Sequence, residues 1–416
     1  MTGQTSETGL RLMAVVAATG FVLAGSFAVL AEDTDWPQYR GPNRDGVSSE
    51  TGLLDQWPAD GPRELWRTSL GQGFSGLSIS GGRIYTMLGE GSDEFVVCLE
   101  GATGEEIWRS RSGANFKDKF GDGPRSTPTV DGELVFALGA KGALHALSTT
   151  DGKPVWKRDL PREFGAKAPR WGYSGAPLVE GKLLLVDVGG KAGSSVVAFD
   201  KKTGKEVWRS QSDKAGYSAP VAMTVSGQRQ VVFFTGTTLL SLSPEDGTLL
   251  WKQDWKTGYD VNAAAPIFIP PDRVFISSGY DVGAAVYRVK VTEKQSEVEE
   301  VWRSREMKNK FSSSVLHEGH LYGFDEKTFK CIDAATGETK WKFRGLGHGS
   351  LIFADGHLVV LGDSGTLVLV EATADAYQEK GRAQIFDGKT WTVPTLSGGK
   401  LYLRDEKQLV SLDVSG

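Results

Sequence analysis

The stretch VAFDKKTGKEVW, residues 197–208, decides the fold of this chain. Apolar and polar residues alternate on both sides of its Thr-Gly pair, which is the pattern of two half-buried antiparallel strands. Glycine suits the turn between them because it adopts positive φ without steric cost. The same pattern, with glycine four residues before tryptophan, recurs in VCLEGATGEEIW (97–108), HALSTTDGKPVW (145–156), LSLSPEDGTLLW (240–251) and KCIDAATGETKW (330–341). The repeat therefore predicts a hairpin whose second strand carries the tryptophan.

A further hairpin precedes each of these units, as in STPTVDGELVFAL (126–138) and GAPLVEGKLLLVD (175–187). Two hairpins give four short strands per unit. The tryptophans of the expected outer strands are Trp66, Trp108, Trp156, Trp208, Trp251, Trp302 and Trp341. Their spacings of 39 to 52 residues are the period of four-stranded blades around a channel. An eighth outer strand, without tryptophan, is expected near Ala383–Phe386.

The two ends of the repeat region indicate the number of blades. RELWRTSL (63–70) has the pattern of an outer strand with no partner before it, and QLVSLDVSG (408–416) that of a third strand with no partner after it. Pairing the two closes the ring and removes exposed sheet edges. The prediction is an all-β, eight-bladed β-propeller of four-stranded antiparallel blades over residues 63–416. Seven blades or an open solenoid are the alternatives.

The segments before the repeats indicate export. A chain of 416 residues exceeds one ordinary hydrophobic core, but a repeat array escapes that limit. Residues 12–31 are apolar, so residues 1–31 are interpreted as a Sec signal peptide cleaved after Ala31, which places the protein in the periplasm or outside the cell. Because about 20 apolar residues can span a bilayer, a retained membrane anchor is the alternative. Residues 32–62 are expected to form an extended leader.

The repeated tryptophans and glycines receive structural roles. Each indole is expected to pack between adjacent blades and to donate its N–H to a main-chain carbonyl. The residues assigned in this way are Gly104, Trp108, Gly152, Trp156, Gly204, Trp208, Gly247, Trp251, Gly337 and Trp341. Cys98 and Cys331 occupy the same repeat position five blades apart, so they are expected to be unpaired core thiols.

The units resemble the repeat of the pyrroloquinoline-quinone propellers, A-x-D-x-x-T-G-x-x-x-W, over essentially the whole mature chain. That superfamily includes the quinoprotein alcohol dehydrogenases and cofactor-free propellers such as the lipoprotein of the outer-membrane β-barrel assembly machinery. WPQYRGPNRDGVS (36–48), residues 349–373 and residues 386–406 are most similar to secreted propellers of planctomycete-type bacteria. The resemblance implies the fold and leaves the activity open.

In the dehydrogenase branch, the resemblance implies a quinone beneath two adjacent cysteines, with Ca²⁺ held by Glu, Asn and Asp beside a catalytic Asp. This chain has no Cys-Cys pair, and the position of Asp260 and Asp281 in the blade does not identify a base. No catalytic residue is therefore predicted, and no cofactor is expected. Pyrroloquinoline quinone with Ca²⁺ is the alternative.

Two other motifs receive ordinary interpretations. His317 and His320 bracket a hairpin turn and are interpreted as exposed turn residues, so no metal site is predicted. GDGPR (121–125) does not lead into a helix, so it is not interpreted as a phosphate cradle.

The residues just before each innermost strand are expected to face the mouth of the central funnel. Alignment of the blades places there Phe74, Arg125, Tyr173, Tyr217, Asn262, Phe311, His348 and Trp391. Five of these eight are aromatic, against 10% of the whole chain, and aromatic residues are enriched at recognition surfaces. Arg170 and Trp171 complete the predicted ligand-binding set. A plug of side chains in a narrow channel is the alternative.

Two loops that lead to this mouth are basic. Residues 111–127 and 157–172 together carry an excess of five positive charges, which attracts anionic groups unless the loops are simply solvated. The net charge of −5 predicts no general attraction to nucleic acid, and none to anionic lipid, so a membrane contact is expected only if the signal is retained.

The predicted function is an extracytoplasmic binding or scaffold propeller, expected to be monomeric. It engages a protein or an anionic polymer at the funnel mouth, with outer-membrane protein assembly as a special case. A reduced quinoprotein dehydrogenase is the alternative.

Overall fold

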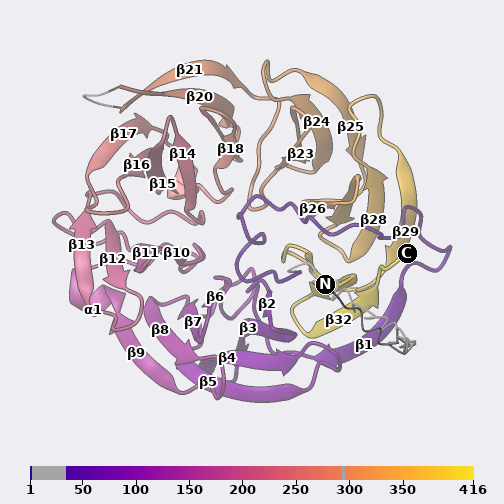
Figure 1. The fold of residues 1–416 in the computed structure, drawn as a ribbon, viewed down its shortest axis with the longest axis horizontal. Coiled ribbons are helices and arrows are strands. Elements are labelled where there is room, and N and C mark those ends of the chain that lie inside the picture. The colour runs from indigo at the N-terminus through magenta and orange to yellow at the C-terminus, as the bar shows by residue number, and fades with distance from the viewer. Residues whose placement is uncertain (2–33, 293–295) are drawn as a thin grey trace. The chain divides into compact units, whose positions relative to one another are not determined.

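The computed structural model describes Met1 and residues 34–292 and 296–416. The expected signal peptide and its cleavage after Ala31 lie outside these residues, apart from Met1. The described strands form eight four-stranded antiparallel sheets arranged as blades around a ring (Figure 1). This confirms the eight-bladed propeller. In the described part of the chain, no helix combines the length and the apolar character needed to cross a membrane.

Seven blades each consist of four consecutive strands, innermost first. Blades 1 to 3 contain β2 (Ser78–Ser80), β3 (Arg83–Glu90), β4 (Asp93–Glu100) and β5 (Glu106–Ala114); β6 (Thr129–Asp131), β7 (Leu134–Leu138), β8 (Ala143–Ser148) and β9 (Pro154–Asp159); and β10 (Leu178–Glu180), β11 (Leu183–Asp187), β12 (Val196–Asp200) and β13 (Glu206–Ser210). Blades 4 and 5 contain β14 (Val221–Val225), β15 (Gln228–Phe234), β16 (Thr238–Leu242) and β17 (Leu249–Asp254); and β18 (Ile267–Ile269), β19 (Arg273–Ser278), β20 (Gly283–Val291) and β21 (Ser296–Ser304). Blades 6 and 7 contain β22 (Val315–His317), β23 (His320–Asp325), β24 (Thr328–Asp333) and β25 (Thr339–Arg344); and β26 (Ser350–Ala354), β27 (His357–Leu361), β28 (Thr366–Glu371) and β29 (Glu379–Gln384). A short helix, α1 (Leu160–Phe164), connects blade 2 to blade 3, and a 3₁₀ turn, η1 (Gly258–Asp260), lies between blades 4 and 5.

Blade 8 joins the two ends of the chain, as predicted. Its order is β30 (Thr395–Ser397), β31 (Lys400–Arg404), β32 (Gln408–Asp413) and β1 (Arg63–Ser69). Arg63 lies opposite Asp413 and Ser69 lies opposite Gln408 in the antiparallel register. The N-terminal strand therefore closes the ring from outside.

The tryptophans join adjacent blades through the repeated glycines. Trp156 donates its indole N–H to the main-chain oxygen of Lys201 in the next blade, at 2.9 Å. A Cβ on Gly204 would lie 2.5 Å from the same ring, and the φ of this glycine is 67°. The predicted carbonyl acceptor is confirmed for six of the seven outer-strand tryptophans. Trp251 differs because its indole donates to Oε1 of Gln230, at 2.8 Å.

The two cysteines are buried and unpaired, as predicted. Each lies opposite the tryptophan of its own blade, Cys98 across from Trp108 and Cys331 across from Trp341. Both positions face the apolar space between blades. Burial raises the pKa of the Cys98 thiol to about 11, so this thiol is protonated at neutral pH.

The leader crosses the centre of the ring instead of only preceding it (Figure 1). Trp36 forms an antiparallel bridge with Ile79 in blade 1, and Val47 forms a parallel bridge with Phe353 in blade 7. The sequence predicted an extended leader but gave no sign of these contacts.

Two buried arginines of the leader bind main-chain oxygens at the axis. Arg40 donates to Ser313 and Ser314 of blade 6. Arg44 donates to Ala176, Pro177 and Pro220 of blades 3 and 4. Burial lowers the pKa of Arg44 to about 9 and also lowers the pKa of Arg40. The leader thus ties several inner strands together.

A tryptophan of the leader completes blade 7. The outer strand β29 spans Glu379–Gln384, so the expected position near Ala383–Phe386 was too far along the chain. Gly381 of this strand lies opposite Leu369, where the other blades place their tryptophan. A Cβ on Gly381 would lie 2.6 Å from Cβ of Trp57, which is 5% exposed. Trp57 therefore packs where the repeat lacks its own indole.

Candidate funnel-mouth binding site

A pocket of about 620 Å³ opens at the funnel mouth and is lined by residues from all eight blades. This volume is within the range of small-molecule sites. Tyr39 and Arg40 of the leader also line it, so the leader that fills the ring centre closes its inner end. The pocket is therefore a blind funnel and not an open channel.

Eight of the ten predicted mouth residues line this pocket. They are Phe74, Arg125, Arg170, Trp171, Tyr217, Phe311, His348 and Trp391. The alignment of blades on their inner strands thus located the mouth, although it could not show that the leader closes the other end.

Tyr173 and Asn262 do not line the pocket. Tyr173 is 1% exposed, and its hydroxyl donates to the main-chain oxygen of Val188 at 2.8 Å. Asn262 is fully buried, and its Nδ2 donates to the main-chain oxygen of Thr235 at 2.8 Å. Successive side chains of an extended segment point to opposite sides. An alignment that is wrong by one residue therefore selects a side chain that points into the core instead of into the funnel.

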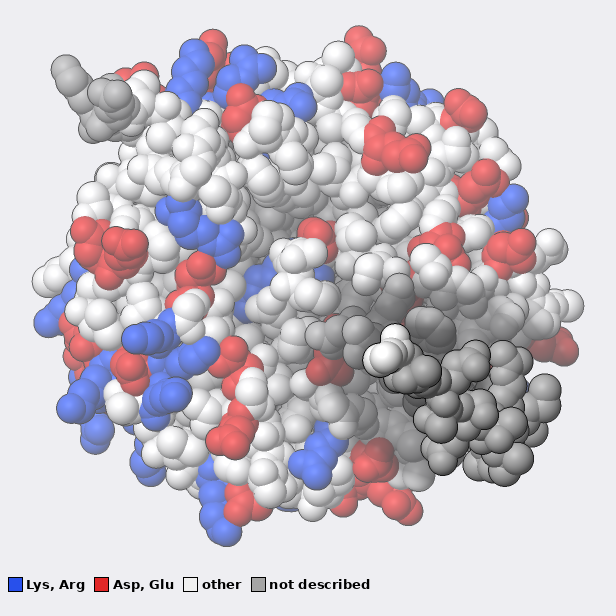
Figure 2. Space-filling view, in the orientation of Figure 1, with Lys and Arg blue, Asp and Glu red and all other residues white. Residues whose placement is uncertain are grey.

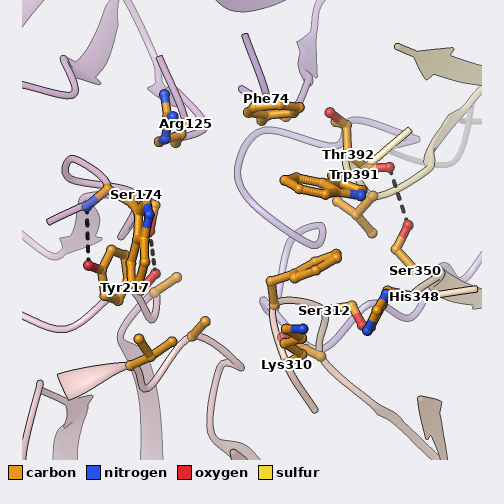
Figure 3. Close-up of a pocket in the computed structure, with 18 of the residues that line it drawn as sticks. Phe74, Arg125, Ser174, Tyr217, Lys310, Ser312, His348, Ser350, Trp391 and Thr392 are labelled. Atoms are coloured by element: carbon orange, nitrogen blue, oxygen red, sulfur yellow. Dashed lines mark hydrogen bonds between the residues drawn. The ribbon is translucent and has the colours of Figure 1, made fainter. Parts of the chain in front are cut away.

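One wall of the pocket is a continuous row of rings (Figure 3). The rings of Phe74 and Trp391 stack with centroids 5.2 Å apart and an interplanar angle of 28°. Phe311 follows at 4.9 Å from Trp391, and His348 at 5.5 Å from Phe311. Flat rings in this arrangement offer an apolar surface against which another ring can pack.

The opposite wall is also aromatic but contains hydrogen-bonding groups (Figure 3). The main-chain N–H of Trp171 donates to the hydroxyl of Tyr217 at 3.3 Å, and Ser174 Oγ donates to the main-chain oxygen of Tyr217 at 2.8 Å. The Arg170 guanidinium lies 5.3 Å from the Trp171 ring and 5.4 Å from the Tyr259 ring. Burial raises the pKa of Tyr217 to about 12, so this wall carries no negative charge at neutral pH.

The charged groups that line the pocket are all basic. They are Arg40, Lys119, Arg125, Arg170 and Lys310. None of the described lining residues is Asp, Glu, Asn or Gln. By contrast, acidic and basic side chains are interspersed around the ring on the face drawn in Figure 2. The positive charge is therefore a property of the pocket and not of the molecule, whose net charge is −5.

Arg125 and Arg40 line the pocket, and no carboxylate in the described lining pairs with them. Arg125 donates to the main-chain oxygens of Gly121 and Gly123 and lies 4.5 Å from the Phe116 ring. Burial lowers its pKa, an effect opposed by the acidic groups behind it. Nε of the buried Arg40 has no hydrogen-bond partner among the described residues. Of the two, Arg125 is the one that is only partly buried, so an anionic group in the pocket would be attracted to it.

Part of the positive charge predicted for the two basic loops is neutralised locally. Arg111 pairs with Asp93 at 2.6 Å, and Arg158 pairs with Glu163 at 3.1 Å. Lys119, Arg125 and Arg170 are the cations of these loops that line the pocket. The attraction of anionic groups to the pocket therefore depends on fewer basic side chains than the composition of the two loops predicts.

Sequence reasoning missed several pocket residues, most clearly Tyr259, Tyr280 and Lys310. Both tyrosines belong to a repeated Gly-Tyr-Asp sequence, at 258–260 and 279–281. This duplication is the signal in the sequence that could have indicated them. Asp260 pairs with Lys214 at 2.7 Å and Asp281 approaches Lys308 at 3.4 Å, while the tyrosines line the pocket.

The pocket does not fit Ca²⁺. This ion takes six to eight oxygen ligands, which usually include carboxylates. The described lining has no carboxylate or side-chain amide and contains basic side chains instead. Elsewhere in the described ranges, no three His, Cys, Asp or Glu residues are grouped to hold a metal. His317 and His320, which were expected to be exposed turn residues, are half-buried at the end of β22 and the start of β23, and the ring of His317 stacks on Phe353 with centroids 4.0 Å apart.

Comparisons with known proteins agree with this fold. A family model described as outer membrane protein assembly factor BamB matches residues 50–140 and 92–343. An outer membrane protein assembly factor BamB from Burkholderia pseudomallei (strain K96243) is 26% identical over 216 residues, which are 50% of this chain and 50% of that protein. The chain thus matches about half the length of this curated relative.

Solved structures show the same fold at low identity. The crystal structure of BamB from Moraxella catarrhalis superposes with a TM-score of 0.60 at 14% identity, covering 84% of this chain and 97% of that one. A quinohemoprotein alcohol dehydrogenase from Pseudomonas putida HK5 gives 0.65 at 12% identity, covering 92% of this chain and 81% of that one. At such identities the likeness concerns the fold alone.

Proposed function

From the premise that this chain belongs to the family described as outer membrane protein assembly factor BamB, we propose that it is a binding propeller of the cell envelope that holds a partner protein at its funnel mouth. The observation that carries the proposal is the composition of the pocket. Its lining combines stacked rings with five basic side chains and lacks acidic ones. Such a surface attracts anionic groups at long range and then offers them an apolar contact.

The family name supports a partner within outer-membrane assembly. The curated relative from Burkholderia pseudomallei is described as an outer membrane protein assembly factor, and the propeller offers a rigid frame on which a partner can be held. A periplasmic or otherwise extracytoplasmic location follows from this role and agrees with the apolar segment at residues 12–31.

The proposal is tested by removing pocket side chains that have little structural role. Arg170→Glu with Trp171→Ala is expected to reduce co-purification of the envelope partner at least about tenfold, because hot-spot side chains dominate an interface. Lys202→Glu, at an exposed residue in the turn between β12 and β13, makes the same charge change away from the pocket. Thermal unfolding is expected to change little in both. Undiminished capture by the double variant would refute the mouth as the binding site.

A reduced quinoprotein with pyrroloquinoline quinone and Ca²⁺ has weaker support. The basic and aromatic lining suits a polycarboxylate, but the lining supplies none of the carboxylates that Ca²⁺ requires. Titration of the purified protein with quinone and Ca²⁺ is expected to give no bound chromophore. A stable chromophore with dye reduction by alcohols would favour the dehydrogenase instead.

A further inference from the structure

Two tyrosines at the rim of the pocket have strained backbones. The φ angles are 65° at Tyr259 and 57° at Tyr280. The aspartate after each tyrosine also has a positive φ, 57° at Asp260 and 61° at Asp281. A residue with a Cβ is strained in this conformation. Both tyrosines are nevertheless exposed, 66% for Tyr259 and 39% for Tyr280. Packing within the molecule therefore does not explain why these turns carry large rings.

Each rim tyrosine lies beside a basic side chain. Arg170 lies 5.4 Å from the Tyr259 ring, and Nζ of Lys310 lies 5.6 Å from the Tyr280 ring. Phe120, which is 44% exposed, has Nζ of Lys119 at 4.9 Å. Three pairs of a ring and a cation, contributed by five loops, thus lie around the mouth.

The exposed rim indicates a ligand that is larger than the pocket. A small molecule inside the cavity would leave the outer faces of Tyr259 and Phe120 in water. An extended chain that enters the pocket and leaves across the rim covers both surfaces. Aromatic and arginine side chains at such positions are typical of protein–protein contacts.

The hydrogen-bonding capacity of the lining favours a polypeptide over an acidic polysaccharide. Each sugar ring carries several hydroxyl donors that need acceptors when buried. The described lining offers hydroxyls and main-chain oxygens but no carboxylate or side-chain amide. A polypeptide segment with carboxylate side chains needs donors instead. Arg170 and Lys119 supply them, together with Lys310, whose Nζ also lies 3.7 Å from Oε2 of Glu326.

We propose that the partner element received at the mouth is an extended acidic polypeptide segment that inserts one aromatic side chain. Its carboxylates meet Arg170, Lys310 and Lys119. Its ring enters between the Trp391 wall and the Trp171 wall. This inference rests on the proposed function and names the chemistry of the partner.

The test uses a fluorescent nonapeptide of alternating Glu and Gly with a central Trp, and the full-length protein. Anisotropy is expected to show saturable binding that weakens as salt is raised, because the contacts are ionic. Replacing the central Trp by Ala is expected to weaken binding at least about tenfold, because the aromatic anchor is lost. A peptide with Lys in place of Glu is expected not to bind.

Protein variants separate a lost contact from a lost fold. Arg170→Glu with Lys310→Glu is expected to weaken binding at least about tenfold, whereas Lys202→Glu is expected to leave it unchanged. Tyr259→Gly relieves the strained φ, so it is expected to weaken binding without lowering the unfolding temperature.

The outcomes distinguish this inference from the function on which it rests. If the acidic peptide fails to bind while the partner still requires the mouth, the inference is wrong and the proposed function stands. Binding of an oligogalacturonate in place of the peptide would also overturn it. If the partner does not require the mouth, both fail.

Discussion

Gly152 lies beneath the indole of Trp108, and a Cβ on this glycine would lie 2.4 Å from that ring. Its φ of 69° adds a second restriction. Gly132 and Gly181 have φ of 59° and 58°, but a Cβ on either would meet nothing within 4 Å. All three positions need glycine for its positive φ, but only Gly152 also needs it because a side chain would collide with an indole.

We therefore expect Gly152→Ala to lower the free energy of unfolding by roughly 2–4 kcal/mol, since it adds overpacking to backbone strain. Gly132→Ala is expected to cost only about 1 kcal/mol. Chemical denaturation of both variants checks the difference. Equal losses would mean that the close contact with Trp108 contributes nothing.

Asp187 at the end of β11 gives the stability a pH dependence. Its pKa is raised to about 7, chiefly by burial and also by nearby Asp213, while the N–H of Gly216 opposes the shift. In the unfolded chain the pKa is about 3.9. The folded state therefore binds the proton more tightly, so this group lowers stability progressively as the pH rises from about 4 to about 7.

Asp187→Asn is expected to stabilise the protein at pH 8 by up to about 4 kcal/mol and to have little effect at pH 4. Thermal unfolding of the two proteins between these pH values measures the change. A stabilisation that does not grow with pH would contradict the assigned cause.

The direction of individual side chains at the mouth could be predicted from the sequence only in part. Trp171 was correctly placed at the mouth, whereas Tyr173, two residues later, is buried beside Val188. Tyr259 lines the pocket, whereas Asn262 is in the core. The repeat aligns strands but not the irregular turns before them, where φ differs from loop to loop. Side-chain direction in those turns therefore could not be predicted.

At the scale of elements, the blades were predictable and the leader was not. Each hairpin is indicated by alternating apolar and polar residues and by a glycine at the turn, so the pairing of its two strands can be predicted from local sequence. Several contacts of residues 34–62 join positions more than a hundred residues apart, such as Arg44 with Pro220. No periodic pattern encodes such contacts, and two buried arginines contradict the usual expectation for charged side chains.

Replacing Trp57 tests whether the leader stabilises blade 7. Trp57→Ala is expected to cost about 3–5 kcal/mol, as much as a repeat tryptophan such as Trp208, because both fill space against an outer strand. Asp60→Ala changes an exposed leader residue and is expected to have little effect. Urea denaturation provides the comparison. A small loss for Trp57→Ala would show that blade 7 is stable without the leader.

At the scale of the whole molecule, ring closure depends on more than the pairing of β1 with β32. Arg404 of β31 is fully buried and donates to the main-chain oxygens of Gly73, Ser75 and Met87 in the first blade and the segment before it. Burial lowers its pKa to about 10. Its guanidinium therefore bridges the first and last blades.

Arg404→Met is expected to lower the free energy of unfolding by about 3 kcal/mol or more, because several buried carbonyls lose their donor. Arg63→Met removes the exposed pair with Asp413 on β1 and β32, and little change is expected. Hydrogen exchange in β1 and β2 should accelerate in the first variant alone. Equal behaviour of the two would exclude Arg404 from ring closure.

We propose that this closed ring binds its partner at the funnel mouth. The most direct measurement places a photoactivatable amino acid at Tyr259, and in a separate chain at Lys202, in cells that make the protein. We expect a discrete crosslinked envelope protein from position 259 and none from position 202. Crosslinks from position 202 with none from position 259 would contradict it.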